Sequence, residues 1–293
     1  MPSLQSLKNR IKSIKSTQKI TKAMKVVSTS KLKKAREKSE AAVHYADKMQ
    51  NLLIAASALI GDEFEETSLL KNNSEEKVQL MIVVTADRGL CGAFNISIIK
   101  TVRKAIDNLV AQGKSIKIIC IGKKGYELLK KNYGKYIIAH KDGIGSKGVK
   151  YSEACDIAER ALSLIHDNQV DSCHIYYNKF KSVIAQVPTQ QQLIPLLKEE
   201  LKEKEEMIIN EFEFEPDKEK ILLDLLPKNL KVQIYKALLE SFAGEHASRM
   251  TAMDNATRNS GEMIKKLQLV YNRTRQAYIT KELIEIISGA EAI

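Results

Sequence analysis

The chain has 293 residues, 44% of them hydrophobic, and 47 Lys and Arg against 36 Asp and Glu, for a formal net charge of +11. A chain this rich in apolar residues can bury a core, which excludes wholesale disorder. Its longest apolar runs, such as 52–60 and 80–84, are far shorter than the ~18–20 residues that a membrane-spanning helix needs. The 4 cysteines show no CxxC spacing, which argues against a zinc site or a disulfide framework and indicates reduced thiols in a reducing compartment.

The positive charge is concentrated at one end. Residues 1–36 hold 11 Lys and Arg and no acidic residue, so residues 37–293 carry 36 basic and 36 acidic residues. The pattern indicates a neutral protein with one basic end. A basic, acid-free start also resembles a mitochondrial transit peptide, although this one is rich in Lys and has only 2 Arg.

Residues 3–60 contain no Gly or Pro and predict one long helix. Stepping 3,4 from Leu4 to Ile60 meets an apolar residue at 12 of 17 positions, which is typical of a coiled coil. Between 18 and 28 this seam is polar, while apolar residues lie on a neighbouring face. Either a local stutter or a different partner for the apolar face explains this fault.

A stripe of lysines flanks the same seam, each one residue after a seam position. The stripe consists of Lys8, Lys12, Lys15, Lys19 and Lys22. Nucleic acid, a membrane surface and an acidic protein collar are all candidate partners for such a patch. Nucleic acid is disfavoured because the first 44 residues contain no Phe, Tyr or Trp to stack on bases. An acidic collar fits at least as well as a membrane.

The middle of the chain alternates between strand and helix patterns. We expect strands at 78–85, 116–122, 136–140, 172–179 and 182–188, and helices at 94–112, 123–132 and 152–168. The alternation predicts a mostly parallel, three-layer α/β sheet. The later strands, including a further one at 207–214, are expected to pair antiparallel at one edge. The acidic run 198–206 is expected to be a solvated loop or short helix.

A Gly-rich segment at 143–148 matches G-x-G-x-x-G literally. In a dinucleotide-binding turn those glycines let the backbone approach a pyrophosphate. Here the motif follows the third strand and lacks the downstream acid, which favours an ordinary loop over a nucleotide site. The 5 His form no ligand spacing, no P-loop motif occurs, and no Ser, His and acid form a recognisable elbow. We therefore expect no cofactor, no metal and no catalytic constellation.

Residues 228–288 form the second long stretch with few helix breakers. The same 3,4 stepping from Val232 to Ser288 meets apolar or aromatic residues at 11 of 17 positions, in one unslipped register. The predicted fold class is α/β: a long antiparallel two-helix coiled coil from the N- and C-termini plus a central three-layer α/β, Rossmann-like domain. The predicted organisation is helix 1–60, linker 61–77, central domain 78–227 and helix 228–293.

Four segments resemble one family, the gamma subunit of F-type (proton-translocating) ATP synthase. They are ITKAMKVVSTSKL at 20–32, TADRGLCGAFN at 85–95, EHASRMTAMDNA at 245–256 and RQAYITKELIEIISGA at 275–290. The match runs essentially end to end, and the last segment is highly specific. Two departures are modest: Val26-Val27-Ser28-Thr29 replaces a more usual Met-Val-Ala-Ala, and Ala93 a more usual second Gly. Because the resemblance begins at the first residues, it implies a bacterial protein rather than one with a transit peptide.

The resemblance implies a central rotor shaft that is not itself an enzyme. Its coiled coil would insert into a hexamer of alpha and beta subunits, and its α/β domain would contact the epsilon subunit and the membrane c-ring. It also implies a peripheral protein on the cytoplasmic face of the bacterial inner membrane, with no nucleic-acid partner and no homo-oligomer. The alternative from the residues alone is a nucleic-acid-binding coiled-coil protein that uses the basic N-terminal helix.

The resemblance also implies roles for particular residues. Met24 and Lys25 would lie beside an acidic region of the beta subunit, and other hexamer contacts would be Arg249, Gln276, Thr280 and Glu282. The lysine stripe would face an acidic collar. The central motif of the family corresponds here to Asp87, Arg88, Gly89, Cys91, Gly92 and Asn95.

Overall fold

A computed structural model describes residues 3–60, 77–146, 148–195 and 218–291 of the chain. The expected strand at 207–214, the acidic run 198–206 and nearly all of the linker 61–77 lie outside the described residues. Contacts divide the chain into two compact units, Met1–Thr29 with Arg249–Ile293 and Ser30–Ser248. We call the first the terminal unit and the second the sheet unit.

The chain begins and ends in the two expected long helices, α1 (Leu4–Ile60) and α7 (Lys218–Glu291). Helix α7 starts ahead of the expected residue 228 and continues through Pro227. Leu230 and Ile234, just beyond this proline, are 4% and 0% exposed. Their burial in the core outweighs the backbone hydrogen bond that a proline inside a helix removes.

The sheet unit is built around five strands, β1 (Val78–Val84), β2 (Ser115–Ile121), β3 (Ile137–Lys141), β4 (Ser172–Phe180) and β5 (Gln186–Ile194). Their order is β3-β2-β1-β4-β5, parallel except for the antiparallel pair β4 and β5. The predicted α/β class is confirmed. The last strand begins later than expected because 182–185 form the hairpin loop, where the amides of Lys181 and Ser182 donate to the Ala185 carbonyl at 3.2 and 3.1 Å.

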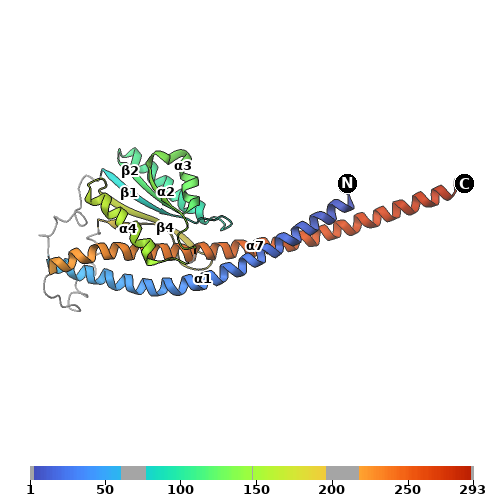
Figure 1. Cartoon of the computed structure of the whole chain (residues 1–293). Coiled ribbons are helices and arrows are strands. Elements are labelled where there is room, and N and C mark those ends of the chain that lie inside the picture. The colour runs from blue at the N-terminus through green and yellow to red at the C-terminus, as the bar shows by residue number, and fades with distance from the viewer. Residues whose placement is uncertain (1–2, 61–76, 147, 196–217, 292–293) are drawn as a thin grey trace. The chain divides into compact units, whose positions relative to one another are not determined.

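Helices cover both faces of this sheet (Figure 1). On one face lie α2 (Phe94–Ala111) and α3 (Lys123–Tyr133), and their apolar side chains meet Met81, Val83 and Ile118 of the strands. On the other face lie α4 (Tyr151–His166) and the nearby part of α7, which meet Leu80, Ile82 and neighbouring strand residues. Strands β1, β2 and β4 contribute side chains to both clusters, so all three are buried on both faces.

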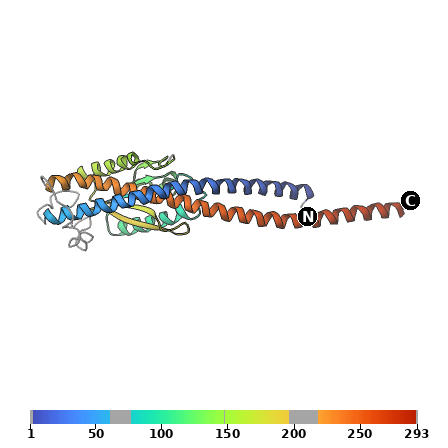
Figure 2. The same cartoon turned by 90° about the horizontal axis from the view of Figure 1, so that it is seen from below.

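The terminal unit consists of the first part of α1 and the last part of α7, side by side and antiparallel, with α7 extending past the start of α1 (Figure 2). Lys25 pairs with Asp254 while the earlier residue Gln18 bonds to the later residue Thr257, which gives the direction. Leu7, Thr21 and Ser28, all expected seam positions on α1, are 4%, 8% and 2% exposed. The expected register of α1 is confirmed at these positions.

The expected register of α7 is wrong near its end. Met263 and Val270 are seam positions in that register, yet both are 47% exposed, and Ile264 is buried at 8%. The helices approach closely at Gly261, where a Cβ would lie 3.1 Å from Nε2 of Gln18. A small residue at the contact lets α7 rotate slightly against α1, so the seam moves to the adjacent residues.

Candidate functional site

The central motif, residues 85–95, joins the carboxyl end of β1 to the start of α2. The hydroxyl of Thr85 accepts from the Gly125 amide at 2.9 Å and lies 3.0 Å from the Ile121 carbonyl, to which it donates. Thr85 therefore ties the end of β1 to the end of β2 and to the first turn of α3.

Asp87 extends this connection to a loop far away in the sequence. One carboxylate oxygen accepts from the Lys123 amide at 3.0 Å, and the other accepts from the Gly143 amide at 2.9 Å. The Lys123 amide is one of the unpaired donors at the start of α3, so a carboxylate there also benefits from the helix dipole. A single aspartate thus fixes the loop that leads into the Gly-rich segment.

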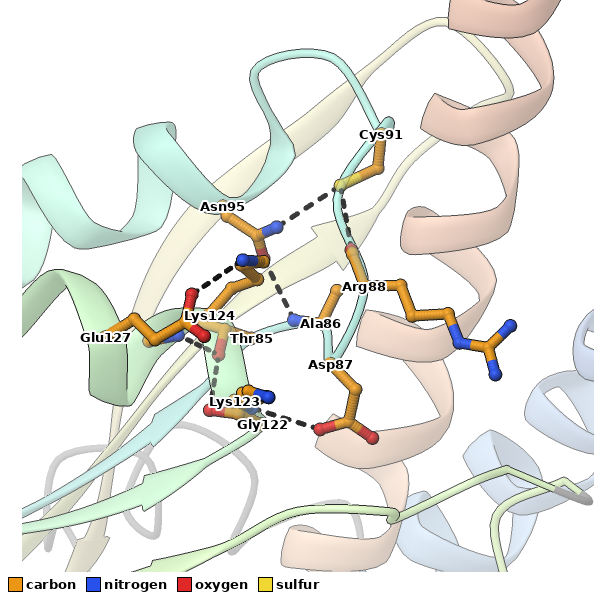
Figure 3. A network of polar contacts seen from close by, with 11 residues as sticks. Thr85, Ala86, Asp87, Arg88, Cys91, Asn95, Gly122, Lys123, Lys124 and Glu127 are labelled. Atoms are coloured by element: carbon orange, nitrogen blue, oxygen red, sulfur yellow. Dashed lines mark hydrogen bonds and ion pairs between the residues drawn. The ribbon is translucent and has the colours of Figure 1, made fainter. Parts of the chain in front are cut away.

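The buried side chain of Asn95 connects two parts of the motif by hydrogen bonds, as Figure 3 shows. Its side-chain oxygen accepts from the Ala86 amide at 2.9 Å, and its side-chain nitrogen donates to the Cys91 sulfur at 3.2 Å. Cys91 is 2% exposed and packs with Ala86 and Phe94 in a small cluster. This arrangement gives Cys91 a structural role in the loop.

The central motif also contacts α7. The hydroxyl of Ser248 donates to the Cys91 carbonyl at 2.6 Å. One turn earlier, a Cβ on Gly244 would lie 3.3 Å from the Phe94 ring and 3.2 Å from Gln186. Helix and sheet therefore meet at close range, and a side chain at 244 would require Gln186 and Phe94 to shift by a few tenths of an ångström.

The remaining motif residues lie on the surface of the loop. Gly92 has a φ of 59°, and Leu90 has a φ of 62° with 65% exposure. The side chain of Arg88 extends to the side of the loop away from Asn95 (Figure 3). At Gly89, no atom of the described residues lies within 4 Å of the place that a Cβ would occupy, so this position has room for a side chain.

The Gly-rich segment 143–148 lies where a Rossmann fold binds its ligand, at the carboxyl ends of the parallel strands. Here α7 fills much of that place: a Cβ on Gly145 would lie 2.9 Å from the Phe242 ring. Among the described residues the remaining cavity, lined by Asp87, Leu238 and Glu245 among others, measures about 30 Å³. This is room for a water molecule rather than for a nucleotide.

The terminal unit carries the residues with implied partner roles. All five lysines of the stripe are exposed, and so are Gln276, Thr280 and Glu282. The Thr280 hydroxyl donates back to the Gln276 carbonyl at 2.9 Å. Met24 is half-buried, and Arg249 is 7% exposed. The roles of these residues stay predictions, because nothing in the isolated chain shows what they contact outside it.

Lys25 has a partner within the chain. Its ammonium lies 2.6 Å from the Asp254 carboxylate, and this hydrogen bond is the main reason why the pKa of Asp254 is lowered below its ordinary value of 3.8. Arg258 lies 3.6 Å from the same carboxylate. The polar seam between 18 and 28 is therefore built from paired polar groups, with Ile20 and Val27 left 58% and 56% exposed on the outside.

The far end of α7 exposes many large apolar side chains among its charged residues. Six of them are between 48% and 63% exposed: Tyr278, Ile279, Leu283, Ile284, Ile286 and Ile287. The described part of α1 ends before it could cover them (Figure 2). Exposed apolar faces of this kind mark surfaces for protein partners.

Comparison with known proteins shows which family has this sequence and fold. The profile of a family described as ATP synthase matches residues 3–293. The ATP synthase gamma chains of Pelagibacter ubique and Sinorhizobium fredii are each 48% identical to this chain over 293 residues, covering 100% of both chains in each case. The chain belongs to the ATP synthase gamma chain family. The gamma chain of Beijerinckia indica is 46% identical over the same length.

Solved structures agree with this family fold. A chain in the central stalk and c-ring structure of Tetrahymena thermophila mitochondrial ATP synthase matches with a TM-score of 0.63 and 28% identity, covering 81% of this chain and 99% of that one. A chain in the Euglena gracilis mitochondrial ATP synthase structure, rotational state 3, matches with a TM-score of 0.70, covering 99% of this chain and 94% of that one. At 18% identity, the second match shows the fold alone.

The sequence marks the central motif but not all of the groups that complete it. Thr85 and Ser248 lie within segments that resemble the family, yet the bonds made by their hydroxyls needed the structure. Gly122 and Gly125, which leave room for Thr85, lie outside those segments, and permissive glycines follow no spacing rule. In the polar seam, the facing residues Asp254 and Thr257 lie in or next to a segment that resembles the family, but the pairing itself needed the structure.

Proposed function

We propose that this chain is the central rotor stalk subunit of an F-type ATP synthase, which couples proton flow through the membrane ring to ATP synthesis by rotation. The observation that carries the proposal is the full-length likeness to ATP synthase gamma chains, at 48% identity without a missing segment. The likeness to a chain of a solved central stalk supports the same role.

The terminal unit is the part suited to enter a hexamer of alpha and beta subunits. Its α7 end presents an apolar face, with Gln276, Thr280 and Glu282 exposed along the same stretch. Ile20 and Val27 add a second outward apolar face beside Met24. The lysine stripe would meet an acidic collar on the hexamer, because five exposed ammonium groups on one helix attract carboxylates.

The chain influences catalysis in other subunits without taking part in the chemical step. A rotor that touches three catalytic subunits unequally changes which conformation each one favours, and this is a coupling free energy between sites. The chain itself contributes no catalytic group and needs no cofactor. The polar, hydrogen-bonded seam suits this task, because paired polar groups fix the register of two helices better than apolar contacts alone.

The sheet unit would contact the epsilon subunit and the c-ring, and the chain would be peripheral to the bacterial inner membrane on its cytoplasmic face. Bacterial gamma chains among the relatives support this location. Among the described helices, none has the length and apolarity to cross a membrane. We expect no homo-oligomer. The nucleic-acid-binding alternative finds no support among the relatives.

Co-purification tests the proposal. Tagged chain expressed with alpha and beta subunits should bring down both, at one chain per hexamer. As a matched pair, Leu283→Asp should weaken this recovery, while Lys265→Asp, at an exposed position earlier on α7 in the same unit, should weaken it less. ATP hydrolysis by the purified chain alone, or failure to recover alpha and beta subunits, would contradict the proposal.

A further inference from the structure

The segment from the middle of α2 to the end of β3 carries a second concentration of positive charge. Residues 100–141 contain 11 Lys and Arg and only 2 acidic residues, Asp107 and Glu127. The zero net charge of residues 37–293 conceals this segment, because acidic residues elsewhere balance it. Residues 37–293 are neutral in total, but their charge is unevenly distributed, and the sheet unit has a basic face of its own.

Both acidic residues on this face are engaged locally. Asp107 accepts from the Tyr133 hydroxyl at 2.9 Å, and Glu127 pairs with Lys124 at 2.6 Å. Two of the basic residues reach away from this face: Lys117 donates to the Gln169 side chain at 2.9 Å, and Lys141 pairs with Asp156 at 2.6 Å. Six further lysines are exposed and have no ion pair within the described part of the chain: Lys100, Lys104, Lys123, Lys130, Lys131 and Lys135.

Half-buried aromatic side chains lie among these lysines. The ammonium of Lys130 lies 5.3 Å from the Tyr126 ring centre, and Tyr126 stacks on His140 at 4.4 Å. The ammonium of Lys135 lies 4.7 Å from the Tyr136 ring centre. Tyrosines with an apolar body and a polar tip suit a boundary between water and lipid.

The kind of basic residue distinguishes the candidate partners. Ten of the eleven basic residues are Lys, and the one Arg, Arg103, donates to the Leu128 carbonyl at 2.8 Å between the two helices. Protein interfaces are enriched in Arg and depleted in Lys, and DNA bases are read mainly by Arg. Clustered lysines without a large apolar patch instead fit the diffuse negative charge of a bilayer surface.

We propose that the outward face of α2, α3 and the 135–141 edge makes an electrostatic contact with anionic lipid headgroups. This contact goes beyond the stalk role, which requires membrane association only through other subunits. A headgroup surface is laterally fluid and offers no fixed register, so a rotating subunit could be attracted to it without being held at one angle.

Vesicle flotation of the purified full chain tests the proposal. The chain should float with phosphatidylcholine vesicles that contain phosphatidylglycerol, should float poorly with phosphatidylcholine alone, and should detach as salt rises. The triple variant Lys100→Gln, Lys104→Gln and Lys131→Gln removes three exposed charges that form no ion pair with the described residues. Each loss should lower vesicle affinity by up to about fivefold.

The matched control removes the same charge from the other basic segment: Lys8→Gln, Lys12→Gln and Lys15→Gln. A greater loss of vesicle binding in the α2–α3 variant than in this control supports the proposal, provided that both variants unfold at the wild-type temperature. An equal or greater loss in the control overturns it. Equal binding to neutral vesicles, or displacement from anionic vesicles by a short oligonucleotide at the same salt, also overturns it, the latter in favour of nucleic acid.

Discussion

The hydroxyls of Thr21 on α1 and Thr257 on α7 lie 2.7 Å apart in the terminal unit, at a position where a coiled coil ordinarily buries apolar side chains. Gln18 adds a bond from its side-chain nitrogen to the Thr257 carbonyl at 3.4 Å, and Lys25 pairs with Asp254 one turn away. The seam fault is thus a set of matched polar pairs rather than a stutter in α1. The apolar residues that it displaces face outward.

Replacing both hydroxyls by methyl groups should strengthen the helix pair and loosen its register. The double variant Thr21→Val with Thr257→Val is expected to gain about 1 kcal/mol in local stability, because buried polar seam residues favour specificity over stability. Hydrogen exchange of the amides in 18–28 measures the gain. Slower exchange in the double variant than in either single variant is expected, and faster exchange would contradict the prediction.

The Asp254 carboxylate should make the same region sensitive to acid. Its pKa is lowered mainly by the hydrogen bond from Lys25, so the ionised form stabilises the folded helix pair. The stabilisation is present above the ordinary pKa of 3.8 and is lost as pH falls through the lowered folded value. Hydrogen exchange near Asp254 should therefore accelerate, after correction for intrinsic rates, as pH falls below about 4. Asp254→Asn should remove this pH dependence, and its persistence would contradict the assignment.

Glu240 should have the opposite pH dependence. It is 5% exposed, burial raises its pKa above the ordinary value of 4.5, and its Oε2 has no hydrogen-bond partner among the described residues. The raised folded pKa means that stability falls as pH rises through 4.5 and levels off once the folded carboxyl has ionised. The advantage of Glu240→Gln over the wild type should therefore grow as pH rises through 4.5, as urea unfolding would show. A difference that does not change with pH would contradict this explanation.

Two glycines near the central motif should respond very differently to alanine. At Gly122 the φ is +93° and a Cβ would lie 2.1 Å from the Thr85 carbonyl oxygen, so Gly122→Ala should lose more than about 3 kcal/mol. At Gly89 no described atom lies within 4 Å of the new carbon, so Gly89→Ala should change stability by less than about 1 kcal/mol. Denaturant unfolding of both variants measures the contrast. Similar losses at the two positions would contradict the packing around Thr85.

Met24→Lys should weaken coupling more than folding. Met24 is half-buried beside the exposed Ile20 and Val27, so a new charge there would alter the outward face while α1 stays helical. In the assembled enzyme the ratio of proton pumping to ATP hydrolysis should fall, with the melting temperature nearly unchanged. Ala23→Lys, at the exposed adjacent position, provides the control. An unchanged ratio in Met24→Lys would count against a partner at this face.

Much of the fold could be predicted because its determinants are local in the sequence. The 3,4 spacing from Leu4 onward predicts which residues of α1 are buried, since helix geometry alone places them on one face. The nearly continuous apolar run at 78–84 likewise predicts β1. The register at the end of α7 could not be predicted in this way, because the close approach at Gly261 depends on the facing Gln18.

The candidate site, too, has features that can be read from the sequence and contacts that only the folded chain shows. Residues 85–95 stand out in the sequence, yet their role depends on Gly143, which is 56 positions from Asp87, and on Ser248, which is 157 positions from Cys91. The basic face of α2 and α3 was present in the composition but disappeared in the total charge of residues 37–293. Local patterns in the sequence suffice for the family, for most helices and strands, and for the exposed lysines of α1. Which polar groups meet depends on how distant segments pack, because hydrogen bonds act over only about 3 Å.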